Sequence, residues 1–309
     1  MNIYLVDGNS YIYRAFHAIK GLTNSKGFPT NAIYGFTNML MKIVRDKKPD
    51  ALCIAFDTSA PTERHAIYES YKAQRPKMPD DLSVQIPHIK KIVNAFRFPV
   101  FEMPGYEADD IICTIAKKAA DLDHTVYIVS GDKDMMQAVN ERIFIFDPVK
   151  DAVINRAGVV ERFGVEPERV PEVMAIAGDS IDNIPGVKGL GEKRAKELLD
   201  EAGSLDALIE HPEKITNERY RQMIIENMED LKMSRTLATI DMNVPVDADI
   251  SSFAVKEPDW SGLLEIFARF EFRSLIKLVP SSRVCSTGSF SIIKNAQELS
   301  DFLKKGCAA

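Results

Sequence analysis

The chain has 309 residues, 45% of them hydrophobic, and its formal net charge is −6 at pH 7. This length and apolar content predict one large or two modest folded domains. The negative balance gives no global indication of nucleic acid, so any basic surface for nucleic acid must be local.

The N-terminus and the cysteines indicate in which cellular compartment the protein is expected. The first apolar run, residues 3–6, has no basic segment before it and ends at Asp7, which excludes a secretory signal peptide. No stretch approaches the roughly 18 uncharged apolar residues of a membrane helix. The four cysteines lie far apart without a CxxC pair, which favours a reducing compartment over a thiolate metal site. We therefore expect a cytoplasmic monomer without a membrane segment.

The first 150 residues alternate strand-like and helix-like patterns. Short apolar runs occupy residues 2–6, 51–56, 125–129 and 143–146, and apolar residues at helical spacing lie between them. This alternation predicts an α/β fold with a mostly parallel sheet and helices on both faces. In such folds, ligands bind at the carboxyl ends of the strands.

Residues 58–80 interrupt this alternation. The segment holds three prolines, several rings and a group of basic residues. Insertions of this length in compact domains are usually functional or disordered. We interpret this one as a partly helical, mobile cap over the strand ends.

Helical patterns fill the rest of the chain to about residue 280. They cover residues 156–176, 191–201, 204–210, 217–239 and 258–270. A Ser/Pro-containing stretch follows, and then residues 290–305 begin a new strand and helix pattern that the chain does not complete. The predicted domains are therefore an α/β core at 1–165, an all-α domain at 166–280, and a linker with a truncated start of a following domain at 281–309.

Carboxylates gather in five short clusters along the chain, and three of the clusters follow predicted strands. Like charges at adjacent strand ends repel one another unless a cation lies between them, and a divalent metal is the usual occupant. Each cluster alone has a simpler explanation, because acids also cap helix N-termini and form turns. Five clusters together favour a metal site. Its candidate ligands are Asp7, Asp57, Glu107, Asp109, Asp110, Asp132, Asp134, Asp179 and Asp182.

A site with this many oxygen ligands favours Mg²⁺ or Mn²⁺, with two or more ions. Two such ions suit phosphodiester hydrolysis, because they activate water and stabilise the charge on the reacting phosphate. Mg²⁺ takes only a few carboxylates directly, so several of these acids would act through water.

A glycine-rich turn at residues 185–195 is the second candidate site. Gly186, Gly189 and Gly191 open a predicted helix whose first N–H groups are free to meet a phosphate. Lys188, Lys193, Arg194 and Lys196 surround the turn and only Glu192 opposes them, which leaves about +3 locally. The GxxGxG order fits neither a dinucleotide fingerprint nor a P-loop. The turn predicts a nucleic-acid backbone contact, and the alternative is a plain helix–helix connector.

The cap segment holds further candidate contacts. Its aromatic residues can stack on unpaired bases, and its basic residues can hold phosphates or stabilise charge on the scissile phosphate. The alternative is an ordinary solvated basic surface, and a tyrosine near the first strand can equally be part of the core. The candidate DNA contacts outside the glycine turn are Tyr11, Arg14, Arg64, Tyr68, Tyr71 and Lys77, and the candidate catalytic cations are Lys72 and Arg75.

These motifs resemble those of the 5′→3′ exonuclease region of bacterial DNA polymerase I, within the flap endonuclease family. The matching stretches are LVDGNSYIYRAF (5–16), AFDTSAPTERH (55–65), YKAQRPKMPDDL (71–82), PGYEADDII (104–112), SGDKDMMQ (130–137) and IAGDSIDNIPGVKGLGEK (176–193). Glu63, Ala66 and Arg194 depart from the usual pattern, and none of them is a metal position.

The resemblance implies a PIN-like nuclease core with a helical arch, and a C-terminal helix-three-turn-helix domain that clamps DNA. It implies that all nine acids are metal ligands and that Lys72 and Arg75 act on the scissile phosphate. It also implies K⁺ at the glycine turn, DNA with 5′ ends or flaps as substrate, and a polymerase module in the same natural chain.

The expected function is a metal-dependent 5′→3′ exonuclease and 5′-flap endonuclease for primer removal in replication and repair. The residues alone support only metal-assisted phosphoester hydrolysis. An aspartyl-phosphate phosphatase is a rival interpretation, but Asn9 stands where that chemistry needs a second aspartate. A non-catalytic binder of DNA junctions is the other alternative.

Overall fold

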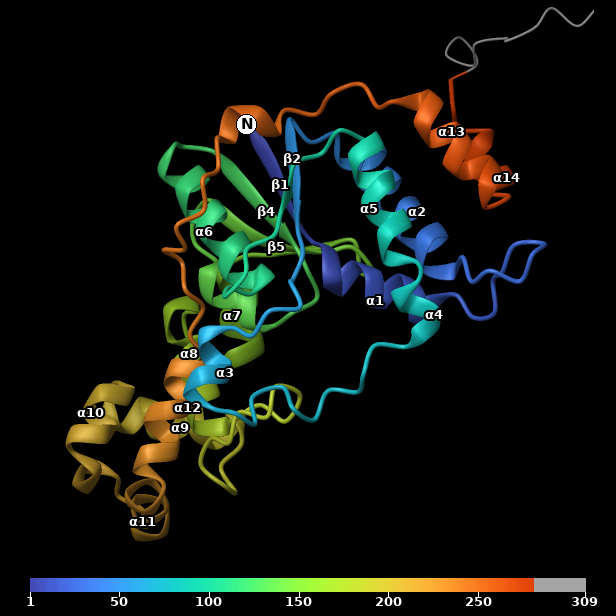
Figure 1. Ribbon diagram of the computed structural model, residues 1–309. Helices are drawn as coiled ribbons and strands as arrows, with labels where there is room; N and C mark the ends of the chain where they lie inside the picture. The colour runs from blue at the N-terminus through green and yellow to red at the C-terminus, as the bar shows by residue number, and fades with distance from the viewer. Residues whose placement is uncertain (281–309) are drawn as a thin grey trace, which may run out of the picture.

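The computed structural model describes residues 1–280, and the N-terminal half of this range surrounds a six-stranded sheet (Figure 1). The strand order is β3-β2-β1-β4-β5-β6, in which β6 is antiparallel to β5 and the other pairs are parallel. The strands are β1 (Asn2–Asp7), β2 (Ala51–Ala55), β3 (Val100–Phe101), β4 (Thr125–Val129), β5 (Ile143–Asp147) and β6 (Ala152–Ile154).

Burial on both faces explains the central strands. Ile3 and Leu5 of β1 pack into one apolar cluster, while Tyr4 and Val6 pack into another, because successive side chains point to opposite faces. The four predicted strand runs are confirmed as β1, β2, β4 and β5. The two other strands are only two and three residues long, too short to give a pattern in the sequence.

Helices cover the two faces of the sheet. In Figure 1, α1, α2 and α5 lie on one side, and α6 and α7 lie on the other. The helices of this region are α1 (Gly8–Ala18), α2 (Asn31–Lys47), α3 (Glu63–Ile67), α4 (Asp80–Ser83), α5 (Ile86–Ala95), α6 (Ala108–Asp121) and α7 (Arg156–Phe163), with a 3₁₀ turn at Asp134–Ala138.

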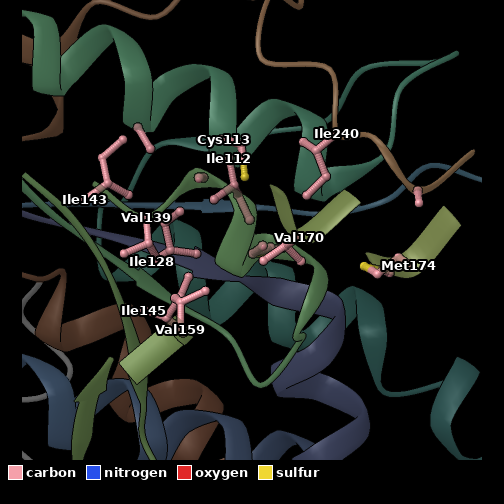
Figure 2. Close-up of a cluster of buried hydrophobic side chains, with 14 of the residues drawn as sticks. Ile112, Cys113, Ile128, Val139, Ile143, Ile145, Val159, Val170, Met174 and Ile240 are labelled. Carbon is pink, nitrogen blue, oxygen red and sulfur yellow. The ribbon is translucent and has the colours of Figure 1, made fainter. Parts of the chain in front are cut away.

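The segment that follows β6 is helical and shares its core with the α6 face of the sheet. Figure 2 shows Ile112 of α6 and Ile128 of β4 in the same cluster as Val170, Met174 and Ile240. The helices are α8 (Val170–Ala177), α9 (Glu192–Ala202), α10 (Leu205–Glu210), α11 (Glu218–Glu226), α12 (Met228–Ala238), α13 (Trp260–Arg269) and α14 (Arg273–Ile276), with 3₁₀ turns at Pro167–Arg169, Pro212–Lys214 and Ile250–Phe253.

The last two helices correct one part of the predicted domain division. Residues 258–280 were expected within the DNA-binding domain, but α13 and α14 pack beside α2 and α5, far from α9 to α11 (Figure 1). Leu263 and Phe267 explain this placement, because both are fully buried in the apolar cluster on that face. The predicted linker and following domain at 281–309 lie outside the described residues.

The 58–80 segment crosses below the carboxyl ends of the strands, from α3 beside α8 and α12 to α4 near α1 (Figure 1). It is only partly helical, as expected, because α3 spans five residues and turns follow it. Its mobility stays a prediction. Among residues 1–280, no helix has the length and apolar content needed to cross a membrane.

Candidate metal and nucleic-acid site

The carboxyl ends of three adjacent strands bring the first acids together. Asp7 is the last residue of β1, Asp57 lies two residues beyond β2, and Asp132 lies three residues beyond β4. In the parallel register, Asp7 lies beside Ala55, and Val6 lies beside Val129. The strand order alone therefore places these three acids at one edge of the sheet.

Asp7 is held by hydrogen bonds on both of its oxygens. Oδ1 accepts the Ser10 N–H at 3.0 Å and caps α1, while Oδ2 accepts the Ser130 hydroxyl at 2.9 Å. Burial raises the pKa of Asp7 to about 6, and the charges of Asp57 and Asp132 add to this rise. The carboxylate is thus oriented by the fold but lacks a positive partner.

A second group of acids begins α6. Glu107 caps the helix, and one ligand oxygen from each of Glu107, Asp109 and Asp110 lies within 4.8 Å of the others. Burial raises the pKa of Asp109 well above its ordinary value, with Glu107 and Asp110 as further causes. Asp57 connects this group to the strand ends, because its Oδ1 accepts the Ala108 N–H at 2.8 Å.

The loop after β4 carries the least satisfied acid among the described residues. Asp134 Oδ1 is buried without a hydrogen-bond partner. Burial raises the pKa of Asp134 to about 8, and Asp132, Asp179 and Asp182 add to the rise. A buried carboxylate oxygen without a donor is costly for the fold unless a cation binds there.

Asp179 and Asp182 come from a loop between α8 and the glycine turn. The two residues are 7% exposed, and Lys133 Nζ lies 2.9 Å from Asp179 Oδ2. Burial opposes ionisation of Asp179, but Lys133 outweighs it and lowers the pKa of this carboxyl group. Asp182 also raises the pKa of Asp132, so the loop reaches the strand-end acids.

The nine predicted acids thus form one electrostatically connected group. The arrangement fits divalent cations, since several of these buried acids have raised pKa values and one of them, Asp134, carries an oxygen that has no donor. Four of the acids already contact basic side chains: Glu107, Asp110, Asp179 and Asp182. The nine acids therefore differ in whether a basic side chain already balances their charge.

Lys72 and Arg75 of the 58–80 segment reach into this acidic group. Lys72 Nζ lies 2.8 Å from Glu107 Oε1 and 3.7 Å from Asp182 Oδ2, and Arg75 forms an ion pair with Asp182. Burial lowers the pKa of Lys72, but the surrounding carboxylates outweigh burial and raise it. Both predicted catalytic cations therefore lie at the acids.

Three predicted DNA contacts are corrected, because their side chains are buried. Tyr11 is 0% exposed and belongs to the core, which is the alternative that the sequence left open. Tyr71 is 3% exposed, and its hydroxyl donates to Glu107 at 3.2 Å, so its ring offers no face to a base. Arg64 is 8% exposed and forms ion pairs with Glu107 and Asp110.

The other candidates in this region keep some access to solvent. Lys77 is exposed, and Tyr68 is half-buried against the apolar core. Arg14 is half-buried, with Nη1 3.7 Å from Asp147 Oδ1 at the end of β5. Contact of Arg14, Tyr68 and Lys77 with DNA stays a prediction.

The glycine turn connects the Asp179–Asp182 loop to α9. Gly186 and Gly189 have φ angles of +58° and +91°, and Gly191 is the N-cap residue of α9, so the turn opens this helix as predicted. Among the described residues, the N–H groups of Lys188 and Gly189 have no acceptor. Lys188 and Lys193 are exposed, while Arg194 pairs with Glu197 and stacks on Tyr220. The turn presents free donors and positive charge to solvent.

Replacing Gly186 with alanine is expected to lower the free energy of unfolding by more than about 2 kcal/mol, which denaturant titration measures. The φ angle is left-handed, and a Cβ would lie 2.3 Å from the backbone nitrogen of Gly178. Gly191→Ala is the matched control, since its φ is −97° and no atom lies within 4 Å of the added Cβ. Equal stability of the two variants would contradict this account of the turn.

Two polar residues at this site were missed in the sequence. Ser130 is 0% exposed, donates to Asp7, and accepts the Asp132 N–H at 3.0 Å, so it links two acids. Lys133 pairs with Asp179. The position of both residues within the SGDKD stretch was the available signal, because neighbours of clustered acids can orient them.

Family models match nearly all of the described chain. The model described as "5'-3' exonuclease, N-terminal resolvase-like domain" matches residues 2–164, and "5'-3' exonuclease, C-terminal SAM fold" matches residues 165–261. Among solved structures, the bacteriophage T5 D15 flap endonuclease, in a complex with DNA and metal ions, has a TM-score of 0.65 at 20% identity and covers 90% of this chain and 99% of its own. The likeness confirms the predicted PIN-like α/β fold with a C-terminal helical domain.

Curated relatives agree with the family models. A "5'-3' exonuclease" of Aquifex aeolicus is 40% identical over 277 residues, which are 90% of this chain and 94% of the relative. A "DNA polymerase I" of Caldicellulosiruptor bescii is 36% identical over 99% of this chain, but the match spans only 36% of that relative. The chain therefore belongs to the 5′-3′ exonuclease family.

Proposed function

We propose that this chain is a divalent-metal-dependent 5′ nuclease that hydrolyses DNA phosphodiester bonds at 5′ ends and 5′ flaps, in primer removal during replication and repair. The observation that carries the proposal is the buried, partnerless oxygen of Asp134, on which Asp132, Asp179 and Asp182 act within the connected group of acids. Family membership supports nuclease chemistry, and the T5 relative is described with DNA and metal ions.

The proposed cofactor is Mg²⁺ or Mn²⁺, with two or more ions. Asp7, Asp132 and Asp134 would hold the ions, since no basic side chain pairs with them among residues 1–280. Glu107, Asp109, Asp57 and the Asp179–Asp182 loop surround them. When bound, such ions activate water and stabilise the charge that develops on phosphate oxygens.

The residues of the chain supply positioning and further charge. Lys72 and Arg75 contact Glu107 and Asp182 from the 58–80 segment, and these contacts support a role in stabilising a phosphate that enters between that segment and the strand ends. Ser130 holds Asp7 and the Asp132 backbone in a fixed orientation. Burial of Glu107 and Asp182 limits the access of bulk water to this region.

The glycine turn would grip the backbone of duplex DNA. The free N–H groups of Lys188 and Gly189, together with the charges of Lys188, Lys193 and Arg194, suit phosphate contacts without base recognition. We include K⁺ at this turn on the basis of the resemblance alone. A cytoplasmic location, a monomeric state and a polymerase module in the same natural chain complete the proposal. The match to about a third of DNA polymerase I supports the polymerase module.

Cleavage of a 5′-flap DNA in Mg²⁺, compared with the same reaction in EDTA, tests this function. We expect short 5′ products in Mg²⁺ and intact substrate in EDTA. A chain that binds the flap structure but cuts nothing in Mg²⁺ or Mn²⁺ would instead be the non-catalytic junction binder. No binding and no cleavage would contradict both proposals.

Lys188→Ala is expected to weaken duplex binding and to reduce the slope of log Kd against log salt by about one unit at most. The reason is the loss of one phosphate contact at the glycine turn. Fluorescence anisotropy at several salt concentrations, in EDTA, measures the slope. Lys48→Ala is the control, because Lys48 is exposed and precedes β2 at the opposite edge of the sheet. An unchanged slope for Lys188→Ala would remove this residue from the DNA contact.

A further inference from the structure

Arg64 is the most completely satisfied charged side chain near the acids. It lies in α3, at the root of the 58–80 segment, and it is 8% exposed. Nε donates to Leu237 O at 3.1 Å, and Nη2 donates to Thr239 O at 2.9 Å. The remaining hydrogen bonds go to Glu107 and to both oxygens of Asp110 at 2.7–3.2 Å. All five N–H groups of the guanidinium therefore have an acceptor.

Asp110 is saturated in the same way. Oδ1 accepts Arg64 Nη2 at 2.7 Å and the Asp241 N–H at 2.9 Å, while Oδ2 accepts Arg64 Nη1 at 2.8 Å and the Glu107 N–H at 3.3 Å. A carboxylate has about four acceptor positions, and all of them are in use. Asp110 consequently has no lone pair to offer to an ion while this arrangement holds.

The two residues join three parts of the molecule. Arg64 comes from the 58–80 segment, Asp110 from the first turn of α6, and their backbone partners from residues 237–241 at the end of α12, which we call the strap. Gln137 fastens the strap to the loop of Asp134, because its Nε2 donates to Asp134 O and Ala238 O and its Oε1 accepts the Ile240 N–H. Figure 2 shows Ile240 of this strap against the α6 side chains Ile112 and Cys113.

Lys72 differs from Arg64 in ways that separate their roles. The Lys72 side chain is 17% exposed, has a single terminal charge and contacts Glu107 and Asp182 without backbone acceptors. A bound ion or a phosphate can displace such a contact. Displacing Arg64 would leave the two strap carbonyls without these donors and the buried Asp110 carboxylate without its cationic partner, which is far more costly.

We propose that Arg64 and Asp110 are a positioning pair, and that Asp110 orients the site through Arg64, Glu107 and the strap instead of binding an ion directly. The pair fixes the direction of Glu107 and Asp109 at the start of α6 relative to the Asp134 loop. This inference rests on the proposed function, and it replaces the prediction that Asp110 is a metal ligand and that Arg64 contacts DNA.

A cavity gives experimental access to the pair. Arg64 and Asp110 both line a cavity of about 810 Å³, together with the strap residues Thr239, Ile240 and Asp241. If Arg64 is shortened to alanine, a free guanidinium ion can enter from this cavity and meet the same acceptors. Urea has a similar planar shape but no charge, so it serves as the matched small-molecule control.

The experiment measures Mn²⁺ affinity without DNA, by electron paramagnetic resonance of free Mn²⁺, in the parent chain and in Arg64→Ala, Arg64→Lys and Asp110→Asn. We expect about a tenfold or larger loss of affinity in all three variants, the usual effect of losing a residue that orients metal ligands. Guanidinium, well below denaturing concentrations, should restore Mn²⁺ affinity to Arg64→Ala, and urea should not. Arg45→Ala, which removes an exposed arginine paired only with Asp46, should bind Mn²⁺ like the parent.

Other outcomes overturn the proposal. Tighter Mn²⁺ binding by Arg64→Ala would make Arg64 a competing cation, and parental affinity in Arg64→Lys would mean that charge alone suffices. If Arg64→Ala does not fold, Arg64→Lys and Asp110→Asn decide the question by the same titration. A parent chain that binds no Mn²⁺ and cuts no flap would contradict the proposed function itself, whereas a functional parent with unaffected variants would contradict only the positioning pair.

Discussion

Asp134→Asn is expected to stabilise the metal-free protein while lowering flap cleavage by at least about 100-fold. Asparagine keeps the shape of aspartate but removes the charge that burial and three neighbouring acids oppose. Because the pKa of Asp134 is raised to about 8, removing its ionisation should add at least about 1 kcal/mol, the energy of a single pKa unit, to the free energy of unfolding at neutral to alkaline pH. Urea denaturation in EDTA and flap cleavage in Mg²⁺ measure the two effects.

The opposite signs of the two effects are the informative part of this prediction. Asp247→Asn is the control, since Asp247 is exposed and far from the acids in the sequence, and it should change neither stability nor cleavage. A loss of stability in Asp134→Asn would mean that the Asp134 carboxylate is stabilised in the metal-free fold. Cleavage at the parental rate would remove Asp134 from the proposed metal site.

Asp110→Ala, in contrast to Asp134→Asn, is expected to destabilise the protein, lowering the free energy of unfolding by about 3–5 kcal/mol. The substitution leaves the Arg64 guanidinium buried with only Glu107 as a charged partner, and it leaves the Asp241 N–H without its acceptor. Cleavage should also be lost, while the folded fraction should keep its affinity for flap DNA in EDTA. Denaturant titration and fluorescence anisotropy measure the two outcomes.

A double variant separates charge pairing from packing. Arg64→Met combined with Asp110→Leu removes both charges, so it should recover part of the stability that Asp110→Ala loses, because the cost of an unpaired buried charge is gone. If Asp110→Ala is as stable as Asp134→Asn, the two acids have equivalent environments, and the distinction between a paired and an unpaired carboxylate is wrong.

The sequence was informative where a local pattern determines a global position. An apolar run followed by an aspartate predicts a strand whose carboxyl end carries an acid, and the parallel register then brings Asp7, Asp57 and Asp132 to one edge. The glycine turn could also be predicted from the sequence, because glycine tolerates the positive φ angles that Gly186 and Gly189 adopt.

Other features depend on contacts between distant parts of the chain. A basic residue in the 58–80 segment looks the same in the sequence whether it meets solvent or a carboxylate, yet Arg64 is buried and Lys77 is exposed. The Arg64 partner Asp110 lies 46 residues away along the chain, and the strap carbonyls that accept from Arg64 lie more than 170 residues away. The return of α13 to the α2 and α5 face was hidden for the same reason, because an amphipathic helix does not specify which surface it covers.

The unfolding temperature of the parent chain in EDTA, followed from about pH 4 to about pH 9, tests the central claim most directly. The pKa values of Asp7 and Asp134 are raised from 3.8 to about 6 and about 8, so the folded state holds these protons more tightly than the unfolded state. Stability conferred by these groups is therefore lost as pH rises through that window, and Mn²⁺ should restore it at the alkaline end. An unfolding temperature that rises with pH in EDTA, and that Mn²⁺ leaves unchanged, would contradict a site of mutually repelling acids that binds divalent metal.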